Sequence, residues 1–494
     1  MSTESATAVV ILAAGQGTRM RSQTPKVLHK VAGRSMLDHA LFAAHGAGAD
    51  DIIAVVGHQK ELVVDGVARW LDANPRERGV GIAHQQEQNG TGHAVQCAFE
   101  RLDEPGQFHG TVIVTTSDVP MLNEQVLRDL LTEHERSPKA AVTVLTASVD
   151  DPHGYGRILR TADGEVTGIV EEKDATDSQR TITEINSGVY AFDADTLRKA
   201  LTMLDTDNAQ GELYLTDVIG IARSLERSVR GHRLDDEWLI AGANDRVQLA
   251  RIGAELNHRL CEAAMRGGAT IVDPATTWLG MDVEIGQDVT ILPGTQLYGA
   301  TRIADGATIG PDTTLDGVTV GEGASVVRTH AIDCEIGKNA DVGPFTYIRP
   351  KTVLAEGAKL GGFVEAKNAQ IGAGSKVPHL TYIGDATVGE QSNIGASSVF
   401  VNYDGVNKHH TTIGNHVRTG SDTMFIAPVT VGDGAYSGAG TVIREDVPPG
   451  ALAVSGGKQR NIEGWVQQKR PGTPAADAAD SALAEGQPDT DQEG

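Results

Sequence analysis

A repeat of six residues decides the fold of the second half of this chain. Residues 285–314 are IGQDVT, ILPGTQ, LYGATR, IADGAT and IGPDTT, and each hexad begins with an aliphatic residue. Glycine or another small residue recurs beside these positions. This period predicts triangular coils, in which each aliphatic side chain points inward and stacks on the coil below, while glycine serves the corners.

The repeat continues far beyond this stretch. It resumes in IGKNAD from Ile336 and in IGAGSK from Ile371, and it ends near Val447. The segment VNYDGVNKHH, which begins at Val401, interrupts the period and is expected to be a loop outside the coil. These coils resemble the left-handed parallel β-helix of the hexapeptide acyltransferases. The resemblance implies a homotrimer with active sites in the clefts between neighbouring chains.

The first half of the chain has a different pattern. The apolar runs AVVILAA, IIAVVG, TVIVTT and AAVTVL begin at Ala8, Ile52, Thr111 and Ala140, and helical patterns separate them. Continuous runs rich in Val and Ile indicate strands that are buried on both faces of a sheet. We therefore expect an α/β domain with a mostly parallel, Rossmann-like sheet, whose ligands bind beyond the carboxyl ends of the strands.

Several boundaries divide the chain, which at 494 residues is too long for one compact core. Apolar residues at near-helical spacing from Asn244 to Met265, followed by Gly267 and Gly268, predict a connecting helix. The last residues, rich in Ala, Asp, Pro and Gly, are expected to be disordered. The predicted units are a nucleotidyltransferase-type α/β domain over 1–243, a linker helix over 244–267, a β-helix over 268–461 and an acidic tail over 462–494.

Composition excludes several classes of function. The formal net charge of -24 repels polyanions, so no nucleic-acid partner is expected. Cys97, Cys261 and Cys334 are widely spaced, which predicts neither a disulfide framework nor a zinc cluster. The apolar run Ala8–Ala14 is too short to span a membrane and has no basic flank for export. The expected compartment is the cytoplasm.

The segment LAAGQGTRMRSQTPK, residues 12–26, directly follows the first predicted strand. A glycine-rich turn after a strand lets backbone amides approach a triphosphate, and a following helix N-terminus adds a favourable dipole. Arg19 and Lys26 can neutralise phosphate charge. A glycine loop alone is equally compatible with a structural turn, whereas the complete string ending in Pro25 and Lys26 is more specific.

This string resembles the sugar-nucleotide pyrophosphorylases, and its spacing is similar to that of the bacterial N-acetylglucosamine-1-phosphate uridyltransferases, the GlmU family. The similarity extends over almost the whole chain, excluding the first residues and the tail. It implies that UTP and UDP-N-acetylglucosamine contact Leu12, Ala13, Ala14, Gly15, Lys26, Gln85, Gly90, Thr91, Gly156, Glu171, Asn186 and Asn244. We interpret His93, in TGHA, as a packing residue rather than a catalyst.

The resemblance also implies a magnesium site formed by Asp118, at the end of TVIVTT, and Asn244. Magnesium is usually held by one carboxylate together with phosphate oxygens. A sugar phosphate and the α-phosphate of UTP are both anions, so cations must shield them, and Arg19 and Lys26 are the candidate catalytic cations. The family usually has glycine before the aspartate. Here the residue is Ser117, and its effect stays open.

The string KVPHLTYIGD, residues 376–385, is similar to the GHLTYLGD segment of the same family. A sugar amine attacks a thioester only when it is deprotonated, and histidine suits that proton transfer near neutral pH. His379 is therefore the candidate general base. The resemblance implies that Arg349, Lys367, Tyr382 and Asn393 contact the sugar phosphate, and that Asn402, Tyr403, Ser421 and Ala439 contact acetyl-CoA.

One departure concerns coenzyme A. The family often has an arginine after an ALAIS segment, whereas ALAVS here is followed by Gly456 and Gly457, so that Lys458 or Arg460 is the candidate replacement.

The expected function is acetyl transfer from acetyl-CoA to glucosamine 1-phosphate in the second half, followed by uridylyl transfer from UTP in the first half. Two alternatives stay open. One is a nucleotidyltransferase whose β-helix only regulates or assembles it, as in relatives of ADP-glucose pyrophosphorylase. The other is a trimerising scaffold that binds nucleotide without turnover.

Overall fold

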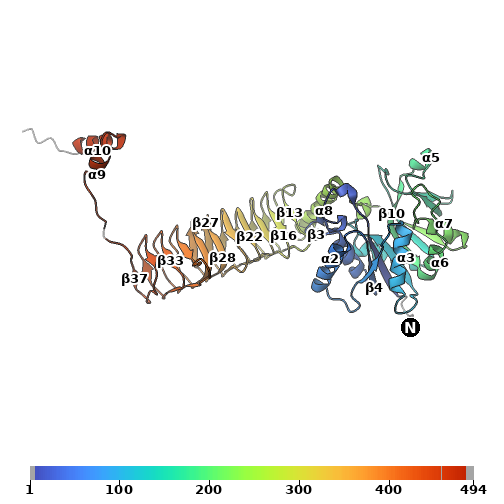
Figure 1. The fold of residues 1–494 in the computed structure, drawn as a ribbon, viewed down its shortest axis with the longest axis horizontal. Coiled ribbons are helices and arrows are strands. Elements are labelled where there is room, and N and C mark those ends of the chain that lie inside the picture. The colour runs from blue at the N-terminus through green and yellow to red at the C-terminus, as the bar shows by residue number, and fades with distance from the viewer. Residues whose placement is uncertain (1–5, 458, 486–494) are drawn as a thin grey trace, which may run out of the picture.

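The computed structural model describes residues 6–457 and 459–485 (Figure 1). An α/β domain forms the N-terminal end, and a long β-helix extends away from it. Helix α8 (Arg246–Arg266) lies where the two meet. The expected combination of a Rossmann-like domain, a linker helix and a β-helix is confirmed.

The α/β domain contains a nine-stranded sheet in which seven strands follow the order β11-β7-β10-β6-β1-β4-β5. Strands β1, β4 and β6 are parallel to one another, as predicted from their apolar runs, and β5, which was not predicted, is parallel to β4. Strand β10 differs because it is antiparallel to both β6 and β7, so the sheet is mixed. The strands are β1 (Thr7–Ala13), β4 (Asp51–Val56), β5 (Gly81–His84), β6 (Thr111–Thr116), β7 (Val142–Ser148), β8 (Arg157–Arg160), β9 (Val166–Val170), β10 (Glu184–Asp193) and β11 (Val229–Leu234).

Helices cover both faces of this sheet. Alternate residues of β1 belong to two cores: Val9 and Ile11 pack with α1, α2 and α4, whereas Ala8 and Val10 pack with α3, α6 and α7. Burial on both faces explains why the strand sequences are continuously apolar. The helices are α1 (Met36–Gly46), α2 (Lys60–Ala73), α3 (Thr91–Leu102), α4 (Glu124–Glu135), α5 (Asp177–Arg180), α6 (Ala194–Leu201) and α7 (Asp217–Ser224).

The β-helix runs from β12 (Thr270–Ile271) to β37 (Leu452–Ala453). Ile291 pairs with Ile309 and Leu297 pairs with Leu315, so these coils take eighteen residues, or three hexads. The aliphatic residues of successive coils form one continuous core along the axis. Strands that carry the later argument are β13 (Trp278–Leu279), β25 (Thr346–Ile348), β27 (Lys359–Gly362), β28 (Glu365–Ile371), β29 (Lys376–His379), β30 (Tyr382–Val388), β31 (Val399–Val401) and β32 (Thr411–Ile413).

Helix α8 closes the first coil of the β-helix. The side chain of Asp245 caps the helix by accepting hydrogen bonds from the amides of Val247 and Gln248. Farther along, the buried side chain of Asn257 donates to the Thr277 carbonyl at 2.8 Å and accepts from the Leu279 amide at 2.9 Å. Asn257 thereby satisfies backbone groups that would otherwise be buried without partners at the end of the stack.

The tail differs from the sequence-based expectation of disorder. The structure contains α9 (Trp465–Lys469) and α10 (Pro474–Glu485), which are joined by a hydrogen bond from Gln467 Nε2 to Asp480 Oδ1 of 3.1 Å. Residues 474–485 are PAADAADSALAE, and alanine has the highest helix propensity while proline is tolerated in the first turn. The helix propensity of the alanines therefore outweighs the low hydrophobicity of this segment. Residues 486–494 lie outside the described part.

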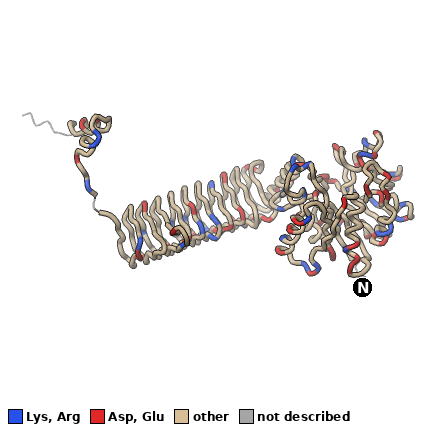
Figure 2. The backbone as a smooth tube through the Cα atoms, in the orientation of Figure 1, with Lys and Arg blue, Asp and Glu red and all other residues tan. Residues whose placement is uncertain are grey.

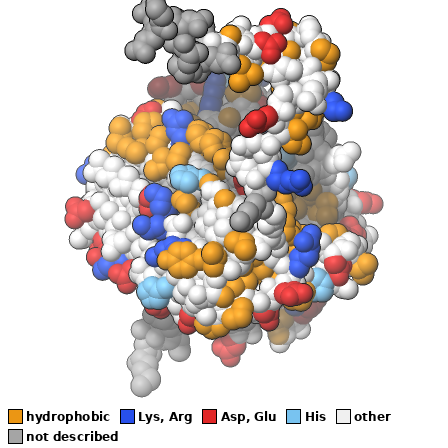
Figure 3. Space-filling view, turned by 90° about the vertical axis from the view of Figure 1, so that its left-hand side faces the viewer, with side chains coloured by type: hydrophobic (Ala, Val, Ile, Leu, Met, Phe, Trp, Pro, Cys, Tyr) orange, Lys and Arg blue, Asp and Glu red, His pale blue; other side chains and the backbone are white. Residues whose placement is uncertain are grey.

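Charge is mixed over both units of the molecule. Acidic and basic residues lie along the α/β domain and the β-helix alike (Figure 2). Seen from the end that carries α9 and α10, Lys and Arg side chains are scattered singly among other residues on that face (Figure 3). All three cysteines are free. Within residues 6–457 and 459–485, none of the helices has the length and hydropathy required to cross a bilayer.

A buried histidine makes the α/β domain sensitive to acid. His134 of α4 is fully buried, and its Nδ1 lies 3.1 Å from Thr143 Oγ1, while its Nε2 has no hydrogen-bond partner in the described structure. Burial, followed by the charge of Lys139, lowers the pKa of His134 to about 4 from 6.5. Between these two values the unfolded chain binds the proton more readily than the folded chain does.

We expect the stability of the α/β domain to fall as the pH drops from 6.5 towards 4, with a contribution from His134 of about 3 kcal/mol. The variant His134→Asn keeps a neutral hydrogen-bonding group that does not titrate, so its melting temperature should fall less over the same range. Calorimetry from pH 7 to pH 4.5 measures this. The variant His258→Asn, at an exposed position on α8, is the control. An equal loss in wild type and His134→Asn would contradict the assignment.

Candidate functional sites

The glycine-rich segment follows the carboxyl end of β1, a central strand of the sheet. It contains two short 3₁₀ helices, η1 (Thr18–Met20) and η2 (Lys26–Leu28). Gly17 has a φ of 59°, and a Cβ atom at this position would lie 2.5 Å from Lys26 Cβ. Glycine is therefore required here because the loop packs directly against the stem of Lys26.

Lys26 is the centre of a polar cluster that joins three distant parts of the sequence. Its Nζ lies 2.5 Å from Asp118 Oδ2 and 2.8 Å from Asn244 Oδ1. Arg19 Nη2 donates to the same Asn244 oxygen at 3.0 Å. The amide of Ala243 donates to the Asp118 carbonyl at 2.9 Å, which holds the two oxygen-bearing residues side by side. The structure thus brings together the residues that the sequence analysis assigned to phosphate and metal.

Asp118 is ionised in this environment. Burial alone would raise the pKa of its carboxyl group, but the charge and hydrogen bond of Lys26 outweigh burial and lower the pKa. The neighbouring Ser117 is buried, and its Oγ donates to the Leu12 carbonyl at 2.8 Å, to which its backbone amide also donates at 3.1 Å. The structure therefore accommodates serine at the position of the family glycine, and its hydroxyl adds a hydrogen bond to the end of β1.

The oxygen atoms of this cluster suit a magnesium ion. A carboxylate and an amide oxygen converge on the Lys26 ammonium, which shows that the space between them accommodates positive charge. No group of three or more His, Cys, Asp or Glu side chains in the described ranges could hold a metal. A magnesium ion here would therefore take its remaining ligands from phosphate oxygens and water, as this ion usually does.

The segment from Gln85 to Thr91 lies beside the glycine-rich loop. Gln85 Nε2 donates to the Gly90 carbonyl at 2.9 Å, and a Cβ at Gly90 would lie 2.5 Å from the Leu213 carbonyl oxygen. Gln88 was not predicted as a site residue, and its Nε2 donates to the Ala14 carbonyl at 2.7 Å and fixes the loop. His93 Nδ1 lies 3.0 Å from the Glu87 carbonyl oxygen, a contact within its own segment that suits a packing role.

The three residues expected at the sugar end lie together. A Cβ at Gly156 would be 3.4 Å from Glu171 Oε1 and 3.5 Å from Asn186 Cβ. The amide of Asn186 donates to the Gly156 carbonyl, and its Nδ2 donates to the Tyr190 hydroxyl at 2.7 Å. Burial, together with the charge of Asp174, raises the pKa of Glu171. The group forms a polar corner on strands β8 to β10.

A second constellation lies on the β-helix, where successive coils place side chains one above another. Ile348 pairs with Ala366, which sets Arg349 beside Lys367 on the next coil. Glu365 pairs with Tyr382 on the coil after that, and Arg349 Nη1 donates to Glu365 Oε1 at 3.1 Å. Arg349, which follows β25, and Lys367 of β28 are thus stacked on adjacent coils. Lys367 pairs with Gly384 of β30, and the Tyr382 hydroxyl lies beside Gly384 and completes this column.

The structure adds a cation that the sequence analysis did not identify. Lys408 lies in the loop between β31 and β32, and its ammonium group beside Lys367, together with burial, lowers the pKa of Lys367. Three cations therefore gather within one small region: Arg349, Lys367 and Lys408. Glu365 and Asp385 lie beside these cations, so the region keeps a net positive charge that favours an anion.

Polar groups border these cations. Asn402 Nδ2 donates to Asp385 Oδ2 at 2.6 Å and lies 3.4 Å from the Tyr382 hydroxyl oxygen. His379 ends β29 with an exposed side chain, while its carbonyl accepts from the Ser397 amide and the Thr381 hydroxyl. Asn393 bridges the neighbouring coils by pairing with Lys376 and Arg418. No bond links the His379 imidazole to the column among residues 6–457.

The residues expected to contact acetyl-CoA follow on later coils. The Gly440 amide donates to the Ser421 carbonyl at 2.8 Å, so Ser421 and Ala439 lie at the same corner of adjacent coils. Tyr403 is exposed on the loop after β31, where its hydroxyl donates to the Gly405 carbonyl. Of the two candidate replacements for the family arginine, Arg460 is exposed, and Lys458 lies outside the described residues.

Comparisons with known proteins show which family this chain belongs to. Residues 9–180 match the family described as MobA-like NTP transferase domain. The bifunctional protein GlmU of Corynebacterium jeikeium is 65% identical over 98% of this chain and 100% of its own length. The bifunctional protein GlmU of Rhodococcus opacus is 62% identical over 96% of this chain and 95% of its own. Identity at this level over nearly the full length establishes that the chain belongs to the GlmU family of bifunctional proteins.

Proposed function

We propose that this chain makes UDP-N-acetylglucosamine in two steps. The β-helix, residues 268–461, transfers an acetyl group from acetyl-CoA to glucosamine 1-phosphate. The α/β domain, residues 1–243, then transfers a uridylyl group from UTP to the product and releases pyrophosphate, while residues 244–267 link the two units. The observation that carries the proposal is that one chain holds two separate clusters of cations, each bordered by residues suited to one of these reactions.

The α/β site is built for transfer between phosphates. A phosphate oxygen of N-acetylglucosamine 1-phosphate attacks the α-phosphorus of UTP, and the bond to the bridging oxygen of the leaving pyrophosphate breaks. Such a transfer depends on positioning and charge stabilisation. Lys26 and Arg19 neutralise the phosphates. Leu12, Ala13, Ala14 and Gly15 provide backbone contacts, Gln85, Gly90 and Thr91 contact the uracil, and Gly156, Glu171 and Asn186 contact the sugar.

Asp118 and Asn244 are the residues that would hold magnesium in this site. When bound, the ion supplies positive charge to the phosphate oxygens and keeps the two anionic substrates together. Lys26 bonds to both of these residues, so binding requires its ammonium to move towards the phosphates. Arg19 donates to the same Asn244 oxygen, so its guanidinium group lies beside the position proposed for the ion and the phosphates.

The β-helix site is built for acyl transfer to an amine. Arg349, Lys367 and Lys408 bind the phosphate of glucosamine 1-phosphate, and Tyr382 and Asn393 contact the sugar. His379 accepts the proton of the amine as its nitrogen attacks the thioester carbonyl carbon, after which the carbon–sulfur bond breaks and the thiolate of coenzyme A leaves. Asn402, Tyr403, Ser421 and Ala439 hold acetyl-CoA. We infer from the use of UTP and acetyl-CoA that both reactions take place in the cytoplasm.

An exposed apolar ladder beside His379 supports a homotrimer. Phe345, Phe363 and Leu380 lie at one corner of successive coils with 52%, 62% and 59% of their surfaces exposed, and the rings of Phe345 and Phe363 stack at 5.1 Å. The Leu380 amide donates to the Gly362 carbonyl, which places the ladder directly next to His379. A contiguous exposed apolar surface favours association. We infer that neighbouring chains cover this ladder and complete the acetyl-transfer site.

Separate substitutions should abolish separate activities. His379→Ala removes the proton acceptor, so acetyl transfer should fall by between about 10²- and 10⁴-fold while uridylyl transfer stays at the wild-type rate. Asp118→Ala should have the opposite effect. Each variant is the control for the other when both half-reactions are assayed. A wild-type protein without acetyl transfer would leave a nucleotidyltransferase whose β-helix only assembles it.

The close approach of Gly17 to Lys26 predicts a strict requirement for glycine. Gly17→Ala adds a Cβ in a left-handed conformation and displaces Lys26, so kcat/KM for UTP should fall by about 100-fold. The matched control is Gly220→Ala on α7, where an added Cβ meets no atom within 4 Å. Initial rates of pyrophosphate release measure the effect. Wild-type kinetics in Gly17→Ala would show that the packing of the loop is not needed.

Lys408 should contribute to substrate affinity in the β-helix site. A hydrogen bond to a charged group is worth up to about 3 kcal/mol, so Lys408→Ala should raise KM for glucosamine 1-phosphate by about tenfold or more. KM for acetyl-CoA should change little. Lys338→Ala is the control, because Lys338 is paired with Glu322 at 2.8 Å on an earlier coil. An unchanged KM in Lys408→Ala would remove this lysine from the phosphate site.

A further inference from the structure

A short hairpin of the α/β domain rests on the first coil of the β-helix. It consists of β2 (Lys30–Val31) and β3 (Arg34–Ser35), and its two turn residues, Ala32 and Gly33, have φ values of 47° and 89°. The Met281 amide donates to the Ala32 carbonyl at 2.9 Å. A Cβ added at Gly33 would lie 3.9 Å from Gly280 Cα. The tip of the hairpin thus meets residues 280–281 backbone to backbone.

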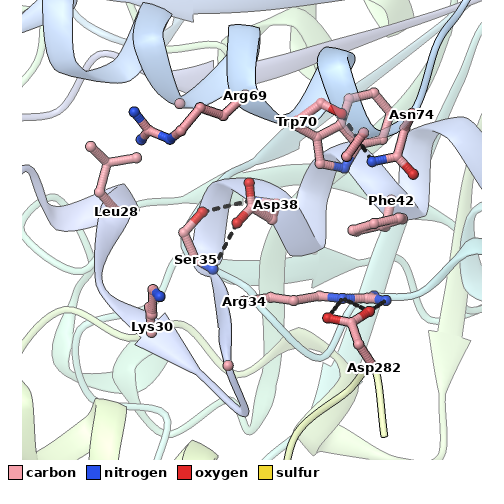
Figure 4. Close-up of a pocket in the computed structure, with 13 residues that line it drawn as sticks. Leu28, Lys30, Arg34, Ser35, Asp38, Phe42, Arg69, Trp70, Asn74 and Asp282 are labelled. Carbon is pink, nitrogen blue, oxygen red and sulfur yellow. Dashed lines mark hydrogen bonds and ion pairs between the residues drawn. The ribbon is translucent and has the colours of Figure 1, made fainter. Parts of the chain in front are cut away.

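An ion pair locks this contact (Figure 4). Arg34 Nε lies 3.1 Å from Asp282 Oδ1 and 3.3 Å from Oδ2, and Arg34 Nη2 also donates to Oδ1. The guanidinium carbon lies 3.8 Å above the ring of Phe42, which fixes its plane. Arg34, Phe42 and Asp282 also line a cavity of about 490 Å³. On that side the hairpin is therefore held by the ion pair and not by closely packed side chains.

The hairpin follows immediately after the phosphate-binding segment. Helix η2 (Lys26–Leu28) ends two residues before β2 begins, so Lys26 and Arg34 are separated by only eight positions. The carbonyl of Val31 lies 3.0 Å from His39 Nε2, and the Met36 amide donates to the His29 carbonyl, so the segment between them is internally fixed. A shift of the hairpin would therefore be transmitted to Lys26.

A small hydrophobic core also connects the first coil to the α/β site. Met20 of η1, Val31 of the hairpin, and Met121, which follows Asp118, belong to one cluster with Ile252 and Leu256 of α8. Met281 of the first coil packs against this cluster. Residue Ala243, adjacent to Asn244, belongs to it as well. The three segments that supply Lys26, Asp118 and Asn244 therefore share a core with the first coil.

We propose that Arg34 and Asp282 are positioning residues for uridylyl transfer: the first coil of the β-helix supports the hairpin that sets the position of Lys26. This inference rests on the proposed function of the α/β site. Neither residue contacts the cluster of Lys26, Asp118 and Asn244. Their effect is geometric, because a displacement of about 1 Å in a phosphate-binding group can cost up to about 100-fold in rate.

The test compares Arg34→Ala, Asp282→Ala and the double variant in the full-length protein. Each single variant should lower kcat/KM for UTP by between about 10- and 100-fold, and the double variant should lose no more than either one, because both remove the same contact. Acetyl transfer should stay within about twofold of wild type. Asp282→Glu keeps the carboxylate and should recover most of the lost rate.

The control is Glu284→Ala, which breaks the Glu284–Arg302 pair of 3.1 Å in the same region, where both side chains are more than 60% exposed. It should leave both activities unchanged. Melting temperatures are measured in parallel. Wild-type kcat/KM in Arg34→Ala and Asp282→Ala, or a lower melting temperature with unchanged kinetics, would overturn the inference. A wild-type protein without uridylyl transfer would instead refute the proposed function of the α/β site.

Discussion

The inward stacking of aliphatic side chains at every sixth residue is the constraint on which the rest of the β-helix depends. It fixes the register between coils, because the apolar residues of successive coils stack in one continuous core, even where a coil has 16 or 17 residues in place of 18. Neighbouring coils are separated by the ordinary spacing of hydrogen-bonded strands, about 4.8 Å. Arg349 and Lys367 are eighteen residues apart and occupy equivalent places on adjacent coils, so the repeat that forms the core also sets the distance between two cations.

Helix α8 connects this constraint to the chemistry at the other end of the molecule. Its capping residue, Asp245, immediately follows Asn244, which bonds to Lys26 and Arg19. Its middle residue, Asn257, completes the backbone hydrogen bonds of the first coil. One helix therefore begins beside the nucleotide site and caps the first coil of the β-helix. The two units are not merely tethered, since the hairpin tip adds a second contact between them.

The sequence predicts those features that repeat or that lie next to each other along the chain. The hexads, the first strand and the glycine-rich loop follow directly from local patterns, and the structure contains all of them. Lys408 was not predicted because the sequence of its loop does not follow the repeat of six residues. Its contact with Lys367 depends on the conformation of that loop. Strand β10 was not predicted, because its sequence EINSGVYAFD has no long continuous apolar run, and no local pattern indicates that it is antiparallel to its neighbours. Helix α10 was missed because low hydrophobicity was weighed above the propensity of its alanines.

The coil-by-coil construction has a consequence for how this chain tolerates changes in length. Coils of 18, 17 and 16 residues, such as those from Leu297 to Leu315, Ile303 to Val320 and Leu315 to Ala331, all keep their apolar side chains in the core, so a coil can lose one or two residues outside the core positions. Removing a whole coil would leave the remaining coils in register. The coils between Asp282 and Arg349 contain none of the residues proposed to bind substrate. They therefore act as a spacer whose length changes by one coil at a time. Evolution could therefore shorten or extend the separation between the two active sites in whole steps without redesigning either one.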